Sequence, residues 1–91
     1  MIEGAVRIVN RLGLHARAAA QLVRLAGRFE SKIKLTRQDN GYSADAKSIL
    51  NVLTLSASDG TELILSADGS DEQEAFDAIS SLIANRFGES L

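Results

Sequence analysis

Hydrophobic residues alternate with polar residues along three stretches of the chain, which is the pattern of half-buried β-strands. These stretches are residues 4–9, 32–36 and 61–67. Asn40 and Gly41 follow the second stretch, and this pair is typical of tight hairpins because both residues tolerate positive φ. Residues 42–45 are therefore predicted to be the returning strand, which makes four strands in all.

A longer stretch, residues 16–29, repeats its hydrophobic residues at the spacing of an amphipathic helix. Arg17, Arg24 and Arg28 fall together on a second face. The stretch is predicted to be a helix with a basic, exposed stripe. That stripe is by default the solvated face of a surface helix, and the alternative is a docking surface for an acidic partner.

Two further helices are indicated in the second half of the chain. Ser48 precedes a short hydrophobic run, residues 49–53, and suits a helix N-cap because its hydroxyl can accept from a backbone amide. Residues 70–73, Ser-Asp-Glu-Gln, match a capping box, and hydrophobic residues at helical spacing continue from there until Gly88. The second helix is thus expected to be short, and the third to be long and to end at Gly88.

The predicted element order is βαββαβα, which belongs to the α+β class. All three helices have a hydrophobic face to bury, and packing them on one face of a four-stranded antiparallel sheet satisfies this requirement. A right-handed first crossover leaves room for the last strand between the first and the second. We expect an open-faced β-sandwich in one domain, residues 1–91, because a chain of this length cannot supply two cores.

Composition excludes several kinds of site. The chain has no cysteine and one histidine, so disulfides and thiolate or multi-histidine metal sites are excluded, and we expect neither a metal nor a cofactor. A net charge of −2 and the scarcity of aromatic residues argue against nucleic acid as a partner. No hydrophobic run is long enough for membrane insertion and no leader pattern is seen, so we expect a cytoplasmic protein.

The histidine lies in the segment Gly13-Leu14-His15-Ala16-Arg17, at the entrance to the first predicted helix. Backbone amides at such an end lack intrahelical partners and attract anions. The same positive field, with Arg17 nearby, favours a neutral imidazole with a nucleophilic nitrogen. The amides of Ala16 and Arg17 and the Arg17 guanidinium could then stabilise a phosphoryl group on that nitrogen. A histidine at a helix start is also commonly a surface or capping residue, and the chemistry alone leaves both interpretations open.

Two segments of the chain resemble the motifs of the HPr family, the phosphocarriers of the phosphoenolpyruvate-dependent phosphotransferase system. Gly13-Leu14-His15-Ala16-Arg17, with Ala19-Ala20, is similar to the family's active-site signature, and Ala46-Lys47-Ser48-Ile49-Leu50 is similar to its second motif. Two motifs at a fitting separation are more specific than either alone, and the resemblance spans nearly the whole chain. The predicted βαββαβα order also agrees with the open-faced sandwich of that family.

The resemblance implies a phosphoryl carrier rather than an enzyme. His15 would accept phosphate on Nδ1 from enzyme I, itself charged by phosphoenolpyruvate, and pass it to an enzyme IIA component in sugar transport. Arg17 would stabilise the charge. Ser48 aligns with the serine that a dedicated HPr kinase modifies in some members, and a helix cap without a regulatory role is the alternative. The family usually has proline at the position of Ala18. This departure bears on how rigidly Arg17 and the phosphate-binding amides are held, and hence on the transfer rate or the choice of cognate enzyme, not on the chemistry itself.

Docking of partner proteins is expected on the face that carries the two motifs. The expected contact residues are Arg24, Arg28, Lys47, Ile49 and Val52, the last two as exposed apolar residues of the short helix. We expect the carrier to be a monomer.

Two other functions fit the same element order. The first is a regulatory module, in a nitrogen branch or in transcription, that acts through the Ser48 surface and does not relay phosphate. The second is a domain that binds a small ligand or nucleic acid. The combination of His15 with Arg17 argues against the first, and the acidic charge balance with few aromatic residues argues against the second.

Overall fold

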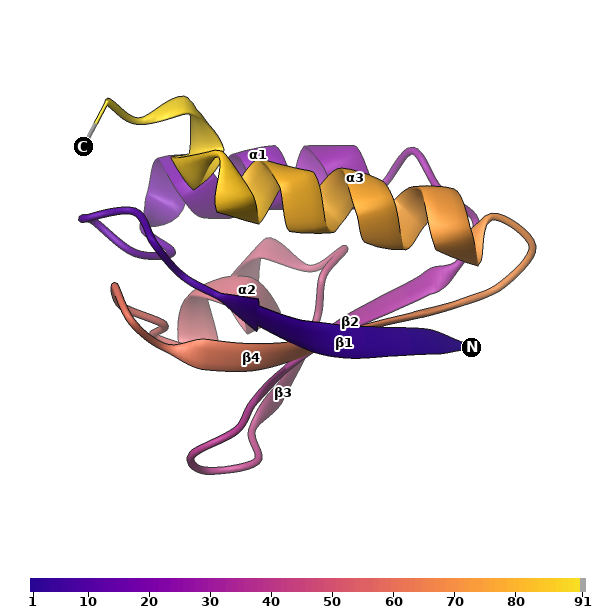
Figure 1. Ribbon diagram of the computed structural model, residues 1–91, viewed down its shortest axis with the longest axis horizontal. Helices are drawn as coiled ribbons and strands as arrows, with labels where there is room; N and C mark the ends of the chain where they lie inside the picture. Colours follow the sequence, from indigo (N-terminus) through magenta and orange to yellow (C-terminus); the bar gives the residue numbers. More distant parts are fainter. Residues whose placement is uncertain (91) are drawn as a thin grey trace.

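The computed structural model describes residues 1–90, and its elements follow the predicted βαββαβα order with one short addition at the end (Figure 1). In chain order they are β1 (Ile2–Arg7), α1 (Ala16–Ala26), β2 (Lys32–Arg37), β3 (Ser43–Asp45), α2 (Ile49–Thr54), β4 (Glu62–Asp68), α3 (Glu72–Ala84) and the 3₁₀ turn η1 (Arg86–Gly88).

The four strands form one antiparallel sheet in the order β1-β4-β2-β3. The last strand thus lies between the first and the second, which confirms the predicted arrangement. β4 occupies this central place because Leu63, Leu65 and Ala67 all point into the core and are fully buried. Ala67 lies opposite the half-buried Ile2 of β1 on one side and the buried Ile33 of β2 on the other, so apolar residues of the core face meet in this register.

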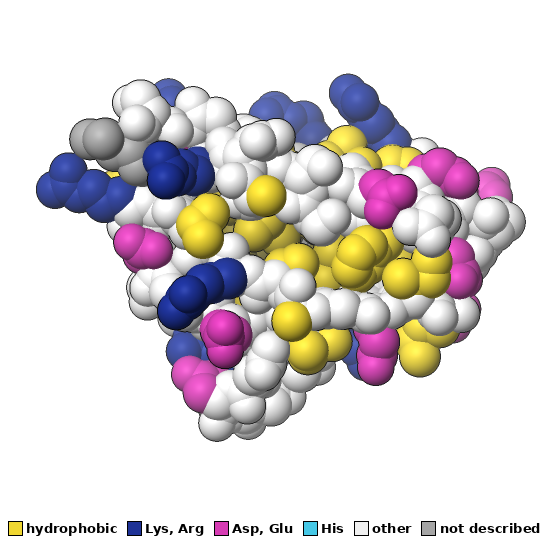
Figure 2. Space-filling model, viewed as in Figure 1, with side chains coloured by type: hydrophobic (Ala, Val, Ile, Leu, Met, Phe, Trp, Pro, Cys, Tyr) yellow, Lys and Arg dark blue, Asp and Glu magenta, His cyan; other side chains and the backbone are white. Residues whose placement is uncertain are grey.

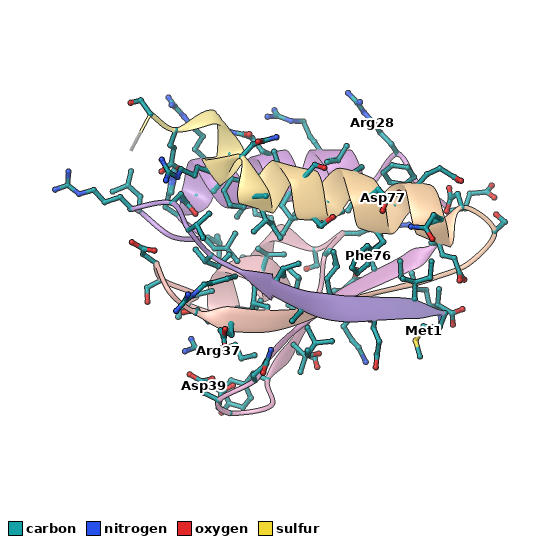
Figure 3. All side chains as sticks on the ribbon, in the orientation of Figure 1. Met1, Arg28, Arg37, Asp39, Phe76 and Asp77 are labelled. Atoms are coloured by element: carbon teal, nitrogen blue, oxygen red, sulfur yellow. The ribbon has the colours of Figure 1, made fainter. Side chains whose placement is uncertain are left out.

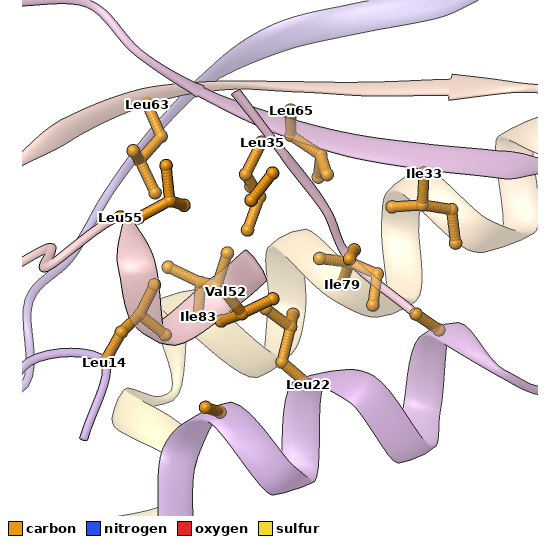
Figure 4. Close-up of a cluster of buried hydrophobic side chains, with 14 of the residues drawn as sticks. Leu14, Leu22, Ile33, Leu35, Val52, Leu55, Leu63, Leu65, Ile79 and Ile83 are labelled. Atoms are coloured by element: carbon orange, nitrogen blue, oxygen red, sulfur yellow. The ribbon is translucent and has the colours of Figure 1, made fainter. Parts of the chain in front are cut away.

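The helices pack on one face of the sheet, which gives the predicted open-faced sandwich. Figure 1 shows α1 and α3 side by side above the strands, and α2 packs against α1 and β3. The core between the two layers is made of aliphatic side chains, and Figure 4 shows ten of them labelled: Leu14, Leu22, Ile33, Leu35, Val52, Leu55, Leu63, Leu65, Ile79 and Ile83. The opposite face of the sheet carries exposed charged residues such as Lys32 and Lys34.

The first strand and the first helix have other bounds than predicted. The first strand runs over Ile2–Arg7 instead of residues 4–9. Ile8 is fully buried, and its backbone bonds to Gly60 and Thr61, which belong to the turn before β4 and not to the strand itself. Helix α1 ends at Ala26, since Gly27 and Arg28 continue only as a tight turn with amides bonded to Val23 and Leu25. Arg28 therefore lies past the end of the helix.

The third helix also begins and ends differently from its prediction. Its N-cap is Asp71, not Ser70, and the Asp71 carboxylate accepts hydrogen bonds from the backbone amides of Glu30 and Ser31 and from the Ser31 hydroxyl. These bonds lower the pKa of Asp71, the Ser31 hydroxyl contributing most. At the other end the helix stops at Ala84, so Phe87 reaches the core from η1 instead of from the helix.

The predicted tight hairpin between β2 and β3 is a longer loop. Gly41 has φ 76°, but Asn40 does not share the positive φ that a two-residue turn of this kind needs. The amide of Arg37 donates to the carbonyl of Tyr42, and the amide of Gly41 donates to the carbonyl of Arg37. Residues 38–41 therefore form the connection.

Basic side chains gather at the end of the molecule where α1 begins and α3 ends (Figure 2). Within residues 1–90, no helix has the length and hydrophobicity to cross a membrane. In the same part of the chain, no cluster of three or more histidine, aspartate or glutamate residues could hold a metal ion.

Candidate functional site

The loop before α1 is held in place by contacts of Gly13 and Leu14 with Ala57, immediately before His15. The amide of Leu14 donates to the carbonyl of Ala57 at 2.8 Å, and Leu14 itself is buried. Gly13 has φ 68°, and a Cβ at this position would lie 2.6 Å from the Ala57 carbonyl oxygen. A residue with a side chain cannot approach so closely. The loop therefore holds His15 in a defined position at the start of α1.

His15 is the N-cap residue of α1, but its side chain does not cap the helix. Its backbone is extended, with φ −72° and ψ 177°, and its carbonyl accepts from the amide of Ala19 at 2.8 Å. The amides of Ala16 and Arg17 belong to the first turn, where no carbonyl of the helix can reach them. The imidazole is 28% exposed. The partly exposed imidazole thus belongs to the residue at which α1 begins, next to amides of the kind that attract anions.

Arg17 is exposed and lies next to the same helix start. It lines a surface pocket together with Arg11, Leu12 and Glu89. A guanidinium in this place adds a permanent positive charge to the field of the helix N-terminus. The arrangement suits an anion bound at the end of α1, within reach of His15.

The His15 ring contacts the carboxylate of Glu89, a residue that the sequence analysis did not identify. Oε2 of Glu89 lies 2.6 Å from Nε2 of His15, and the Asn10 side-chain amide donates to the same oxygen at 3.1 Å. The hydrogen bond from His15 is the main reason that the pKa of Glu89 lies below its ordinary value. The Asn10 amide acts in the same direction, and burial opposes both.

Arg24 and Arg28 are exposed, but they do not share the His15 site. At the rise of an α-helix, Arg24 lies about 14 Å along the axis from His15. Arg28 follows the far end of the helix, away from the chain's C-terminus (Figure 3). The predicted basic stripe therefore extends along α1 from the site, with Arg17 alone of the three at the histidine.

Lys47 and Ser48 lie at the start of α2. The ammonium group of Lys47 donates to the carbonyl of Phe29 at 2.6 Å and thereby ties α2 to the segment that follows α1. Ser48 is the N-cap of α2, and its hydroxyl oxygen accepts from the amide of Asn51 at 3.4 Å, as predicted. Its side chain is half-buried.

The prediction that Val52 is an exposed docking residue is wrong. Val52 is fully buried and faces Leu22 of α1 and the core, because α2 turns its Val52 side toward the sheet (Figure 4). Ile49 is exposed, as expected, and the other exposed apolar residues of α2 are Leu50 and Leu53. Leu50 is 73% exposed, so it replaces Val52 as the most prominent apolar side chain of this surface.

Sequence reasoning missed both Asn10 and Glu89. Asn10 is fully buried, and its amide also donates to the carbonyl of Gly13 at 2.8 Å, so it braces the loop before His15. An uncharged polar residue directly after a strand was the one available signal, and it points equally to a turn. Nothing in the spacing of residues along the chain links Asn10 or His15 to Glu89.

The chain matches a known family over most of its length. The sequence model described as the phosphorylation site of the PTS HPr component matches residues 2–85. The match includes both motifs on which the resemblance was recognised, around His15 and Ser48.

Relatives and solved structures agree with this match. The phosphocarrier protein HPr of Cupriavidus necator is 54% identical over 89 residues, which are 98% of each chain. An HPr crystal structure from Thermoanaerobacter tengcongensis has a TM-score of 0.92 at 42% identity and covers 100% of both chains. The HPr dimer from the same organism has a TM-score of 0.77 at 42% identity, with 98% of this chain and 100% of that one covered.

Proposed function

The chain belongs to the HPr family of phosphocarrier proteins, and on this premise we propose that His15 carries the phosphoryl group. As a phosphocarrier it is not an enzyme: it binds one phosphoryl group and gives it up again. The observation that supports His15 most directly is its place as an N-cap whose side chain does not cap, which leaves the first amides of α1 for an anion next to the ring.

Arg17 and the first amides of α1 are the groups proposed to stabilise the bound phosphoryl group. A phosphoryl group on His15 adds negative charge at a helix N-terminus, where the helix dipole favours it. The amides of Ala16 and Arg17 can donate to its oxygens, and the exposed Arg17 guanidinium can pair with its charge.

The proposed donor is enzyme I charged by phosphoenolpyruvate, and the proposed acceptor is an enzyme IIA component of a sugar phosphotransferase system. Both would dock on the surface that extends from His15 along α1, the turn after it and the start of α2. The proposed contact residues are Arg24, Arg28, Lys47, Ile49 and Leu50. Apolar side chains surrounded by basic ones suit a partner with an apolar patch and an acidic rim.

Ser48 is proposed as a regulatory site, modified by an HPr kinase/phosphorylase. A phosphate at this N-cap would meet the favourable end of the α2 dipole, so the fold would tolerate it. It would also place negative charge within the basic docking surface. We further propose that the carrier acts as a monomer in the cytoplasm, where phosphoenolpyruvate is made. A regulatory module without relay is not adopted, because the family is one of phosphocarriers.

The test is phosphorylation in a defined mixture. The purified chain is incubated with enzyme I and phosphoenolpyruvate, and its intact mass is measured before and after mild acid. The expected result is a gain of one phosphoryl group that mild acid removes, since phosphohistidine is acid-labile and phosphoserine is not. Ser48→Ala serves as the matched control and should gain the same acid-labile group. No gain, or an acid-stable one, would refute His15 as carrier.

A further inference from the structure

The C-terminal segment turns back over the start of α1. After α3 ends at Ala84, Arg86 has φ 58° and Phe87 has φ 54°, and Gly88 follows with φ 78°. Left-handed backbone is strained for arginine and phenylalanine, so it persists only where the surroundings impose it. Phe87 is 3% exposed and anchors the turn in the core. The turn then carries Glu89 to the helix start, 74 residues from His15 along the chain.

The contact between Glu89 and His15 determines which ring nitrogen holds a proton. An ionised carboxylate can only accept hydrogen bonds, so in the 2.6 Å contact the donor is the Nε2–H of His15. In the neutral imidazole the other nitrogen, Nδ1, then carries the lone pair. The buried Asn10 amide fixes the same carboxylate oxygen at 3.1 Å and is itself fixed by the carbonyl of Gly13.

We propose that Glu89, held by Asn10, is a positioning residue that keeps the proton on Nε2 of His15 and leaves Nδ1 as the phosphoryl acceptor. The proposal rests on the proposed function of His15 and adds two residues to it. Glu89 does not touch the phosphoryl group in this arrangement. It acts through the imidazole, on the ring nitrogen opposite the reacting one.

The chemistry of transfer explains why a carboxylate is useful there. The lone pair of Nδ1 attacks phosphorus, and the bond from phosphorus to the donor breaks, its electron pair leaving with the donor. The proton stays on Nε2, so the ring becomes a phosphorylated imidazolium. Its positive charge develops beside the Glu89 carboxylate, which stabilises it as a carboxylate does beside a catalytic histidine. Onward transfer reverses these changes, and the ring returns to the neutral form with its proton still on Nε2.

The test compares Glu89→Gln with the parent protein by two measurements. The glutamine keeps the size of the side chain but offers both a donor and an acceptor to Nε2, so the tautomer is no longer fixed. Because His15 is the one histidine of the chain, ¹⁵N shifts of its ring report the tautomer without overlap. We expect the Nδ1–H form to rise in Glu89→Gln, and phosphorylation by enzyme I to slow by at least about tenfold.

Two control variants separate positioning from loss of charge or fold. Glu74→Gln removes the same charge from an exposed position in α3 and should leave both measurements unchanged. Asn10→Ala should slow transfer in the parent protein and slow it less in the Glu89→Gln background, since both variants act on the Asn10–Glu89 contact while Asn10 also holds the Gly13 carbonyl. Urea unfolding identifies any variant that is simply less stable.

The possible outcomes distinguish this proposal from the function on which it rests. If the parent protein gains no acid-labile phosphate, the proposed function fails, whatever the tautomer. If the parent protein is phosphorylated and Glu89→Gln matches it in rate and in ring ¹⁵N shifts, or is faster, the positioning role of Glu89 is overturned. A slower rate together with a changed tautomer supports it.

Discussion

The N-terminal ends of α1 and α2 begin at residues that behave in opposite ways. At α2, the Ser48 hydroxyl turns back and accepts from the amide of Asn51, so the cap satisfies its own helix. At α1, the His15 ring turns away to Glu89 and leaves the first amides for another acceptor. The same helix-end physics stabilises the fold at one site and attracts an anion at the other. The side chain at the cap decides which.

Replacing each cap residue should therefore affect different properties, and the largest effect is expected for His15→Ala. This variant loses no cap hydrogen bond, only the contact of the ring with the partly buried Glu89 carboxylate, so its stability should change by about 1 kcal/mol or less. It should, however, accept no phosphate at all. Intact-mass measurement after incubation with enzyme I and phosphoenolpyruvate checks the transfer, and urea unfolding checks the stability. Acid-labile phosphate on this variant would show that another residue is the carrier.

The next largest effect is expected for Arg17→Ala. Removing a group that stabilises the transferred charge costs about 10²-fold in rate at comparable sites, whereas an exposed arginine contributes little to stability. Arg7→Ala is the matched control, because it removes the same charge from an exposed position in β1, outside the proposed docking surface. Single-turnover phosphorylation at low salt separates the two. Equal rates for Arg17→Ala and the parent protein would mean that the amides alone hold the phosphoryl group.

The site at the start of α1 was partly predictable from the sequence. Period-two and helical patterns gave the element order, and two motifs located His15 and Ser48. The contact to Glu89 was not predictable, because it spans 74 residues and depends on a left-handed turn at Arg86 and Phe87. Neither residue type signals that conformation, since it is uncommon for side chains of their size.

The burial of α2 shows a second limit of prediction from sequence patterns. Helix α2 has only six residues, and apolar side chains lie around most of it: Ile49, Leu50, Val52 and Leu53. Their spacing therefore does not tell which side of the helix is buried. The packing of α2 against Leu22 of α1 decides it, and buries Val52 while exposing Leu50. The N-cap at Ser48 was predictable, in contrast, because capping depends on local chemistry.

A smaller effect on transfer is expected at the start of α2. Ser48→Asp adds negative charge to a basic docking surface, and we expect phosphorylation of His15 by enzyme I to slow by about tenfold. Phosphorylated Ser48 should slow it further, because it carries more charge. Ser48→Ala should leave transfer unchanged and lower the free energy of unfolding by about 1 kcal/mol through loss of the cap. Unchanged transfer in the phosphorylated protein would restrict Ser48 to its role as a cap.

The smallest effect is expected for Ala18→Pro, which restores the usual residue of the family to the third position of α1. Its amide belongs to the first turn and bonds to no carbonyl of the helix, so a proline removes no helical hydrogen bond there. Fixing φ in the unfolded chain should raise the free energy of unfolding by about 0.5 kcal/mol.

Transfer by Ala18→Pro should be equal to that of the parent protein or faster, because a stiffer first turn holds Arg17 and the amides of the site more firmly. Ala20→Pro is the control two residues further on: its amide faces a carbonyl inside the helix, so proline there should cost about 3 kcal/mol. Urea unfolding and single-turnover phosphorylation measure both variants. Ala18 is fully buried, so the proline ring must fit against the core. A large loss of transfer in a stably folded Ala18→Pro protein would show that this helix start has adapted to alanine, and that the amide of residue 18 itself binds the phosphoryl group.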